Sequence, residues 1–218
     1  MINIKKLILS AGMPRSGSTW MYNTIRILIL NQYIHKEDFT YGWIEDIDKL
    51  PPSKIRLIKI HNHEENIVNK SDIIFYSYRD IRDAIASSFR KFGTKPSIKL
   101  ASQFIEQHFK WEKISNYTMR YETMLKDKEK IVMEIANVLN IKSCSPQKII
   151  NQIENMNYNS NGKKNEIYNM DNLFHRDHIT DGRHGSWRDT LSESFIKEIE
   201  NKYSSWLNDY GYPLSDDQ

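Results

Sequence analysis

Short apolar runs alternate along this chain with longer stretches in which apolar residues recur every three or four positions. The runs at 6–11, 55–60 and 73–78 are rich in aliphatic and aromatic residues and predict buried strands. The longer stretches predict amphipathic helices, because this spacing places apolar side chains on one helical face. The alternation is typical of an α/β fold with three layers, a central parallel sheet flanked by helices.

The predicted helices have recognisable ends. Asp80 is a suitable N-cap for a helix over 81–92, and Ser145 followed by Pro146 is typical of a helix start, since proline is tolerated in the first turn. The remaining elements are helices at about 18–30, 97–114, 131–139 and 192–208, and a short strand at 117–121.

The segment 151–172 interrupts this pattern. It is rich in asparagine and poor in apolar residues, which predicts a loop or mobile lid, with a plain disordered excursion as the alternative. No internal repeat or Pro/Gly linker divides the 218 residues, and this length is typical of one domain. We therefore expect a single domain over 1–218.

Composition narrows the class of protein. Hydrophobic residues at 39% and charged residues at 27% are ordinary for a soluble globular chain, and a net charge of +3 does not indicate nucleic-acid binding. No apolar run predicts a membrane span, and a single cysteine, Cys144, excludes an internal disulfide. We expect a cytoplasmic protein, and the absence of a Cys/His ligand cluster predicts no metal site.

The segment from Gly12 to Trp20, with the sequence Gly-Met-Pro-Arg-Ser-Gly-Ser-Thr-Trp, lies between the first predicted strand and the first predicted helix. Backbone N–H groups in such a turn form a concave donor surface for an anion. Gly17 permits close approach to the backbone, and Arg15 adds a full positive charge. Three hydroxyl side chains add further donors: Ser16, Ser18 and Thr19. The Gly-Lys-Ser/Thr ending of a Walker A loop is missing, so hydrolysis of a magnesium nucleotide is not implied.

Three further segments follow in order. Lys59-Ile60-His61 ends the second predicted strand, Arg79 leaves the third with Ser87 eight residues later, and Gly182-Arg183-His184-Gly185 is a late glycine-rich loop. With the phosphate loop, they resemble the family of sulfotransferases that use PAPS (3′-phosphoadenosine 5′-phosphosulfate). The resemblance covers nearly the whole chain and implies a P-loop-like fold and transfer of the sulfuryl group of PAPS, with no metal required.

The resemblance also implies catalytic roles. His61 takes the proton of the acceptor, which suits the pKa of histidine near neutrality. Lys59 touches the transferring group, and Arg15 steadies negative charge on the leaving phosphate oxygen. His63 is a nearby competitor for the role of base, but it lies off the motif.

The implied cofactor-binding residues are Pro14, Arg15, Ser16, Gly17, Ser18, Thr19, Trp20, Arg79, Ser87, Tyr121, Gly182 and Arg183. The phosphate loop surrounds the 5′-phosphosulfate, and Arg79 with Ser87 binds the 3′-phosphate, because a guanidinium engages two oxygens at once. Trp20 and Tyr121 neighbour the adenine, with core packing as the rival interpretation.

The late loop departs from the family's commoner pattern. Thr180 and Asp181 stand where a basic pair usually precedes the first glycine, so Arg183 is expected to supply the charge instead. His178 and His184 are candidates to assist, although each alone is more often an ordinary loop histidine. Outside these contacts, Arg82 and Asp83 are expected to be solvated.

The function predicted from these segments is transfer of a sulfuryl group from PAPS to a hydroxyl or amine of a small-molecule, saccharide or lipid acceptor. A P-loop-type kinase and a non-catalytic nucleotide-binding module are the alternatives. The segments expected to line the acceptor are 33–43, 92–98 and 151–172; the aromatic residues of the first either line a site or pack as a surface loop. The acceptor itself and the oligomeric state are not readable from the sequence.

Overall fold

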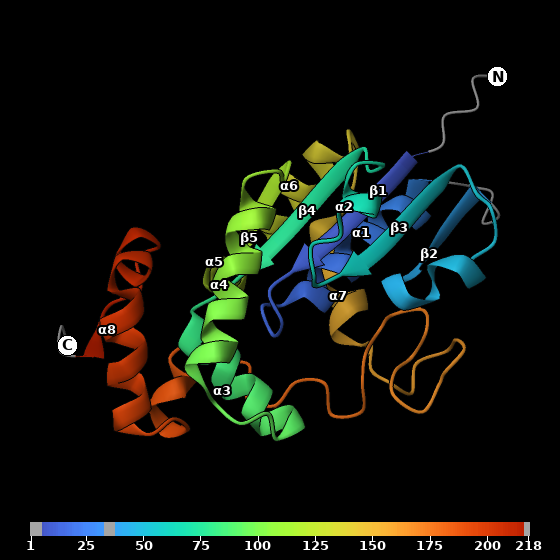
Figure 1. The fold of residues 1–218 in the computed structure, drawn as a ribbon. Helices are drawn as coiled ribbons and strands as arrows, with labels where there is room; N and C mark the ends of the chain where they lie inside the picture. The colour runs from blue at the N-terminus through green and yellow to red at the C-terminus, as the bar shows by residue number, and fades with distance from the viewer. Residues whose placement is uncertain (1–5, 33–37, 216–218) are drawn as a thin grey trace.

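A five-stranded sheet in the order β2-β3-β1-β4-β5 forms the centre of the protein, whose computed structural model describes residues 6–32 and 38–215. The strands are β1 (Lys6–Gly12), β2 (Phe39–Trp43), β3 (Ile55–Ile60), β4 (Ile73–Tyr78) and β5 (Tyr117–Arg120). All neighbouring strands pair in parallel, so their carboxyl ends lie at one edge of the sheet (Figure 1). The chain reverses its direction of winding beside β1, and such a reversal leaves a crevice at the carboxyl ends.

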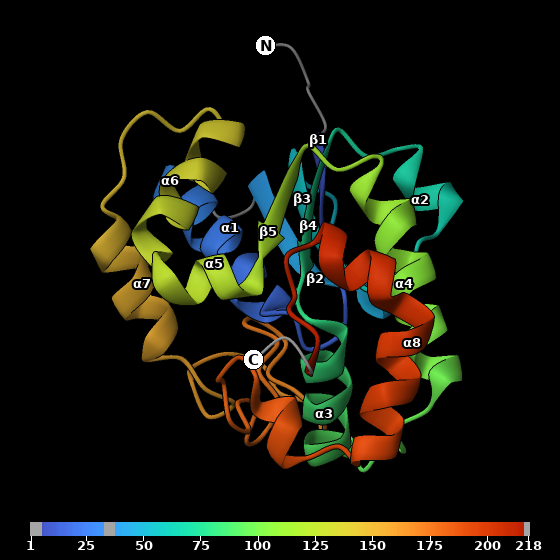
Figure 2. The ribbon, with the colours of Figure 1, turned by 90° about the vertical axis from the view of Figure 1, so that its left-hand side faces the viewer.

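Helices cover both faces of the sheet (Figure 2). One face carries α1, α5, α6 and α7, and the other carries α2, α4 and α8, while α3 extends beyond the carboxyl edge. The helices are α1 (Ser18–Gln32), α2 (Glu65–Val68), α3 (Ile81–Phe92), α4 (Ile98–Glu112), α5 (Tyr121–Lys126), α6 (Lys128–Val138), α7 (Pro146–Glu154) and α8 (Glu193–Asp209). Two short 3₁₀ helices are η2 (Ile44–Lys49) and η3 (Ser186–Asp189). The predicted three-layer, P-loop-like α/β fold is confirmed.

The central strands are buried on both faces, which explains their continuous apolar runs. Ile8 on β1 packs with Met21 and Ile25 of α1, whereas its neighbour Leu9 packs on the opposite face with Trp111 of α4. A third cluster joins α3, α4 and α8 through residues such as Ile85. The sheet is therefore held rigidly between two apolar layers, and its carboxyl edge is a fixed platform.

Several predicted boundaries shift. The strand β2 was not predicted, because its five residues are interrupted by Gly42 and read equally well as a surface loop. Residues 33–37 of the first expected acceptor segment lie outside the described residues. The strand β5 ends at Arg120, since Tyr121 already begins α5. The helix α7 runs through Glu154, so the irregular segment is 155–185 and not 151–172.

The prediction that Arg82 and Asp83 are solvated is wrong. Arg82 forms ion pairs with Asp80 at 2.7 Å and with Glu200 of α8 at 2.5 Å, and its planar guanidinium lies over the ring of Trp187. Both residues are fully buried because α8 and η3 cover that face of α3. Asp80 caps α3 as predicted, accepting a hydrogen bond from the backbone N–H of Arg82.

The irregular segment 155–185 crosses below the carboxyl edge of the sheet (Figure 1) and is fastened by buried asparagines. The amide of Asn169 donates to the carbonyls of Tyr158 and Ser160, and its oxygen accepts from the N–H groups of Asp171 and Asn172. Asn169 is fully buried. The asparagine-rich composition therefore serves to satisfy backbone groups that no regular element pairs.

Asn169→Ala is expected to destabilise this segment, because two carbonyls and two N–H groups lose their partner. We expect the free energy of unfolding to fall by about 1–3 kcal/mol and limited proteolysis within 155–185 to accelerate. The matched control is Asn159→Ala, at an exposed position in the same segment. Equal stability and equal proteolysis for the two variants would contradict this role.

Candidate functional site

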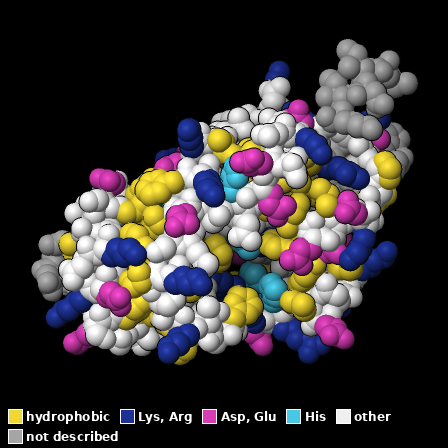
Figure 3. Space-filling view, viewed as in Figure 1, with side chains coloured by type: hydrophobic (Ala, Val, Ile, Leu, Met, Phe, Trp, Pro, Cys, Tyr) yellow, Lys and Arg dark blue, Asp and Glu magenta, His cyan; other side chains and the backbone are white. Residues whose placement is uncertain are grey.

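A cavity of about 620 Å³ opens at the carboxyl edge of the sheet, between the phosphate loop and the irregular segment. Figure 3 shows a hollow on this side of the molecule with histidine and hydrophobic side chains at its rim. The sequence-predicted residues that line the cavity are Pro14, Arg15, Gly17, Ser18, Thr19, Trp20, Lys59, His61, Arg79, Ser87, Tyr121 and Gly182. The structure thus brings segments from β1, β3, β4 and the late loop to one place.

The phosphate loop is held in a left-handed turn. Arg15 and Gly17 have φ values of 66° and 75°, and a Cβ atom on Gly17 would lie 2.9 Å from the ring of Tyr121. Glycine is therefore required at this position for both conformation and space. Ser16 does not line the cavity: its hydroxyl is buried and bonds the hydroxyl of Ser77 at 2.7 Å, fastening the loop to β4.

Arg15 is a partly buried cation held by neutral groups. Its Nε donates to Oγ of Ser87 at 3.0 Å, and its Nη2 donates to the carbonyl of His178 at 2.8 Å. Burial, and then the nearby Arg79 guanidinium, lower the pKa of Arg15 to about 10. Among the described residues no carboxylate forms an ion pair with Arg15 or Lys59, so the site carries positive charge that only an anion from outside would balance.

Lys59 near the end of β3 and His61 directly after this strand meet the phosphate loop from the other side. The Nζ of Lys59 donates to Oγ1 of Thr19 at 2.8 Å, and burial and the charge of Arg15 lower its pKa to about 7. The Nδ1 of His61 donates to the carbonyl of Gly12 at 2.6 Å. Burial and the charge of Lys59 lower the pKa of His61 to about 3, so its ring is neutral and Nε2 is left as an acceptor.

Arg79 joins three parts of the site. Its Nη1 donates to the carbonyl of Arg15 at 3.1 Å and its Nη2 to the carbonyl of Arg183 at 3.0 Å, while Asp83 lies 3.3 Å from Nη2. The guanidinium stacks on the ring of Tyr121 at 4.1 Å, and the Tyr121 hydroxyl donates to the carbonyl of Gly182. The late loop is therefore fixed to the phosphate loop through one buried arginine.

Two buried nitrogen atoms of this cleft are hydrogen-bond donors that a polar ligand would satisfy. Nε1 of Trp20 and Nε of Arg79 have no hydrogen-bond partner in the described part of the chain. Since buried donors are nearly always satisfied, atoms like these at the wall of a cavity indicate groups that a bound molecule completes. Aromatic faces and unpaired cations in the same cleft fit a nucleotide carrying more than one phosphate or sulfate group.

The structure does not bring the guanidinium of Arg183 to the cavity. Its Nε and Nη2 bond both carboxylate oxygens of Asp181, at 2.6 and 2.8 Å, and the side chain is exposed. Only the backbone of Arg183 takes part, through its carbonyl. Asp181 stands where the commoner family pattern has a basic residue. Its carboxylate binds the guanidinium of Arg183 and holds it away from the cavity.

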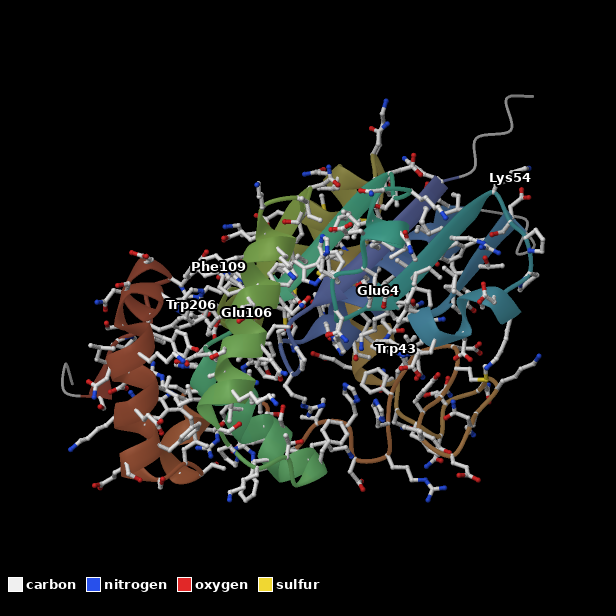
Figure 4. The ribbon with its side chains drawn as sticks, viewed as in Figure 1. Trp43, Lys54, Glu64, Glu106, Phe109 and Trp206 are labelled. Atoms are coloured by element: carbon white, nitrogen blue, oxygen red, sulfur yellow. The ribbon has the colours of Figure 1, made fainter. Side chains whose placement is uncertain are left out.

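Sequence reasoning left several wall residues unassigned. Trp43 ends β2 and lies with its ring 5.1 Å from that of His61; Figure 4 labels it above the irregular segment. His175 and His178 also line the cavity and stack at 5.6 Å, and Phe92 contacts His175. His63 stays outside the cavity, with its ring on Trp111. The position of Trp43 and Phe92 in the expected acceptor segments signalled these two residues, and His178 was expected only to assist the late loop, whereas nothing in the sequence singled out His175.

Comparison with known proteins identifies the class. The model of the sulfotransferase domain family matches residues 96–211, just over half of the chain, and the chain belongs to this family. The match includes Tyr121 and the late loop, whereas the phosphate loop, Lys59 and His61 precede it. No curated protein sequence matches the chain.

Solved structures share the fold. The mouse sulfotransferase SULT7A1 complexed with PAP superposes with a TM-score of 0.66 and 20% identity, covering 97% of this chain and 89% of that one. Retinol dehydratase in complex with androsterone and the inactive cofactor PAP gives 0.63 and 18%, covering 96% and 82%. Its complex with retinol and PAP gives 0.63 and 18%, covering 96% and 83%.

Two further observations concern residues 6–32 and 38–215. In these ranges, no helix combines the length and the apolar character needed to cross a membrane. The same ranges hold no group of three or more His, Cys, Asp or Glu side chains placed to bind a metal ion.

Stability is expected to fall steeply in mild acid. Burial lowers the pKa of His61 to about 3, and it lowers those of His175 and of His108, which is fully buried on α4, to about 4, from 6.5 in the unfolded chain. As the pH falls from 6.5 towards 4, the unfolded chain takes up protons that the folded chain does not, and each histidine costs up to about 1.4 kcal/mol per pH unit. Urea unfolding between pH 7 and 5 measures the loss.

His61→Asn is expected to reduce the dependence of the unfolding free energy on pH, because Asn does not titrate. His63→Asn, at a histidine outside the cavity, is the matched control. An unfolding free energy that is constant from pH 7 to pH 5 would contradict the burial of neutral histidines.

Proposed function

We propose that the protein transfers the sulfuryl group of PAPS to a hydroxyl or amine of a small-molecule, saccharide or lipid acceptor. The observation that carries this proposal is the single cavity that joins the phosphate loop, the pair Lys59 and His61, and the pair Arg79 and Ser87. Membership of the sulfotransferase domain family and the presence of PAP in the structural relatives support it.

The cleft suits the two ends of this nucleotide. The phosphate loop and Arg15 offer backbone donors and an unpaired cation to the 5′-phosphosulfate. Arg79 and Ser87 offer charge-assisted and neutral donors to the 3′-phosphate, a group that ATP lacks. Trp20 and Tyr121 offer flat faces for the adenine between them.

His61 is the proposed general base. Its Nδ1 is occupied by the carbonyl of Gly12, so the free Nε2 is the atom that accepts a proton. As the acceptor oxygen forms its bond to sulfur, its proton passes to Nε2, and the bond from sulfur to the phosphate oxygen breaks with its electron pair on the leaving PAP. Burial and then the charge of Lys59 hold the pKa of His61 low, and an anionic nucleotide offsets the second of these effects, which makes His61 a stronger base when PAPS is bound.

Lys59 is the proposed contact to the transferring group. Its pKa of about 7 results from burial beside Arg15, so the arrival of the phosphosulfate favours its charged form. The ammonium then stabilises charge that develops between the sulfur and the leaving oxygen. These steps use residues of this chain and PAPS, and they require no metal ion.

The remaining wall of the cavity favours an acceptor with an apolar body. Its side chains are largely aromatic or aliphatic, including Trp43, Phe92, Ile167 and Phe174, with Glu45 as an exposed carboxylate among them. A small molecule or lipid that presents one hydroxyl to His61 fits this wall better than a polar saccharide does. Retinol dehydratase, which shares the fold, is solved with androsterone and with retinol.

His61→Asn is expected to lower kcat by about 10²–10⁴-fold with little change in affinity for PAP, because Asn still donates to the carbonyl of Gly12 but has no basic nitrogen. Transfer of radiolabelled sulfate from PAPS to 2-naphthol, with calorimetry of PAP binding, measures both quantities. His63→Asn is the matched control. Near-normal turnover of His61→Asn would overturn the assignment of the base.

Ser87→Ala is expected to weaken binding of PAP by about 5–10-fold, the effect of one lost hydrogen bond, and to leave adenosine 5′-phosphate unaffected. Calorimetry with the two nucleotides measures the difference. Ser88→Ala is a close control, since Ser88 is also buried on α3 but lies outside the cavity. Equal weakening of both nucleotides by Ser87→Ala would place the 3′-phosphate elsewhere.

A further inference from the structure

A second histidine of the cavity, His178, has a defined protonation and no part in the reaction proposed above. His178 lines the same cavity from the irregular segment, and its neighbour His175 stacks against it with an angle of 14° between the rings. A role for His178 in sulfuryl transfer rests on the proposed function.

The hydrogen bonds give His61 and His178 opposite tautomers. The backbone N–H of His175 donates to Nδ1 of His178 at 3.3 Å, so the proton of the neutral ring is on Nε2. Nε2 of His61 is bare, because its Nδ1 donates to the carbonyl of Gly12. In the described ranges, Nδ1 is the ring nitrogen of His178 that finds a protein partner, which leaves its Nε2–H for a ligand. One ring therefore presents an acceptor and the other a donor.

The main chain of His178 is tied to the phosphate loop. Its carbonyl accepts from Nη2 of Arg15 at 2.8 Å, across 163 residues of sequence. The turn that presents the ring contains Asp177 in the left-handed region, with φ of 46°. A non-glycine residue held there costs free energy and is maintained only where surrounding contacts require it. The segment is thus fixed to the cation that faces the phosphosulfate.

The surroundings of His178 favour an anionic partner. Burial lowers its pKa, and then the charges of Lys59 and Arg15 lower it further. In the described part of the chain neither Lys59 nor Arg15 pairs with a carboxylate, and the ring of His178 lies within the field of both. A group bound by both cations is anionic, and a neutral N–H donor beside it adds a hydrogen bond without adding charge.

We propose that His178 donates a hydrogen bond from Nε2–H to an oxygen of the sulfuryl group that PAPS transfers. No proton moves to or from His178: it binds the SO₃ group as the bond to the phosphate oxygen breaks and the bond to the acceptor forms, while His61 alone takes the acceptor proton. His178 thereby complements Lys59, which contacts the same group from β3.

The test compares PAPS and PAP, which differ only in the sulfuryl group. For His178→Leu we expect about a 10-fold loss of affinity for PAPS with PAP unchanged, and a loss of kcat of about 10–100-fold. His178→Gln, whose amide places an N–H near the position of Nε2, is expected to recover most of both. Calorimetry with each nucleotide and transfer of labelled sulfate to 2-naphthol provide the readouts, and His63→Leu is the matched control.

The outcomes separate the inference from the proposed function. A wild-type protein that binds neither PAP nor PAPS would overturn both. If the wild type binds both nucleotides, the inference alone is overturned by any of three results for His178→Leu: unchanged affinity for PAPS, equal loss of PAP and PAPS, or a defect that His178→Gln shares in full.

Discussion

The buried guanidinium of Arg79 is the interaction on which the site depends. It bonds the carbonyl of Arg15 in the phosphate loop and the carbonyl of Arg183 in the late loop, pairs with Asp83, and stacks on Tyr121. Segments that are far apart in the sequence are joined at the end of β4 by one planar group. Because the sheet fixes the position of β4, the walls of the nucleotide cleft are fixed before any ligand binds.

Pairing distinguishes the structural cations from those available to a ligand. Arg82 is saturated by Asp80 and Glu200 and holds α8 to α3, so it has no capacity left for an anion. Lys59 is also buried and Arg15 is partly buried, but these two are bonded to hydroxyls and carbonyls, and their lowered pKa values show the cost of keeping them charged. A nucleotide with two anionic groups relieves that cost, which couples binding of the nucleotide to the electrostatics of the cleft.

The fold, and the meeting of the site residues at the carboxyl ends of the strands, were predictable because both follow from local sequence patterns. Parallel strands bring their carboxyl ends together, so a phosphate loop, a Lys-x-His ending and an arginine at strand ends must meet. The orientation of Arg183 was not predictable, because it depends on Asp181, and the burial of Arg82 depends on a glutamate 118 residues away. His178 lies in a segment without periodicity, where only tertiary contacts decide which side chains face the cavity.

Calorimetry of the unmodified protein with PAP, adenosine 5′-phosphate and magnesium ATP tests most directly whether the cleft binds a nucleotide with both a 5′- and a 3′-phosphate. A cleft with separate sites for the 5′- and 3′-phosphates predicts that PAP binds at least about 10-fold more tightly than adenosine 5′-phosphate, the effect of one charge-assisted contact, and more tightly than ATP. Equal affinity for PAP and adenosine 5′-phosphate, or preference for magnesium ATP, would contradict it.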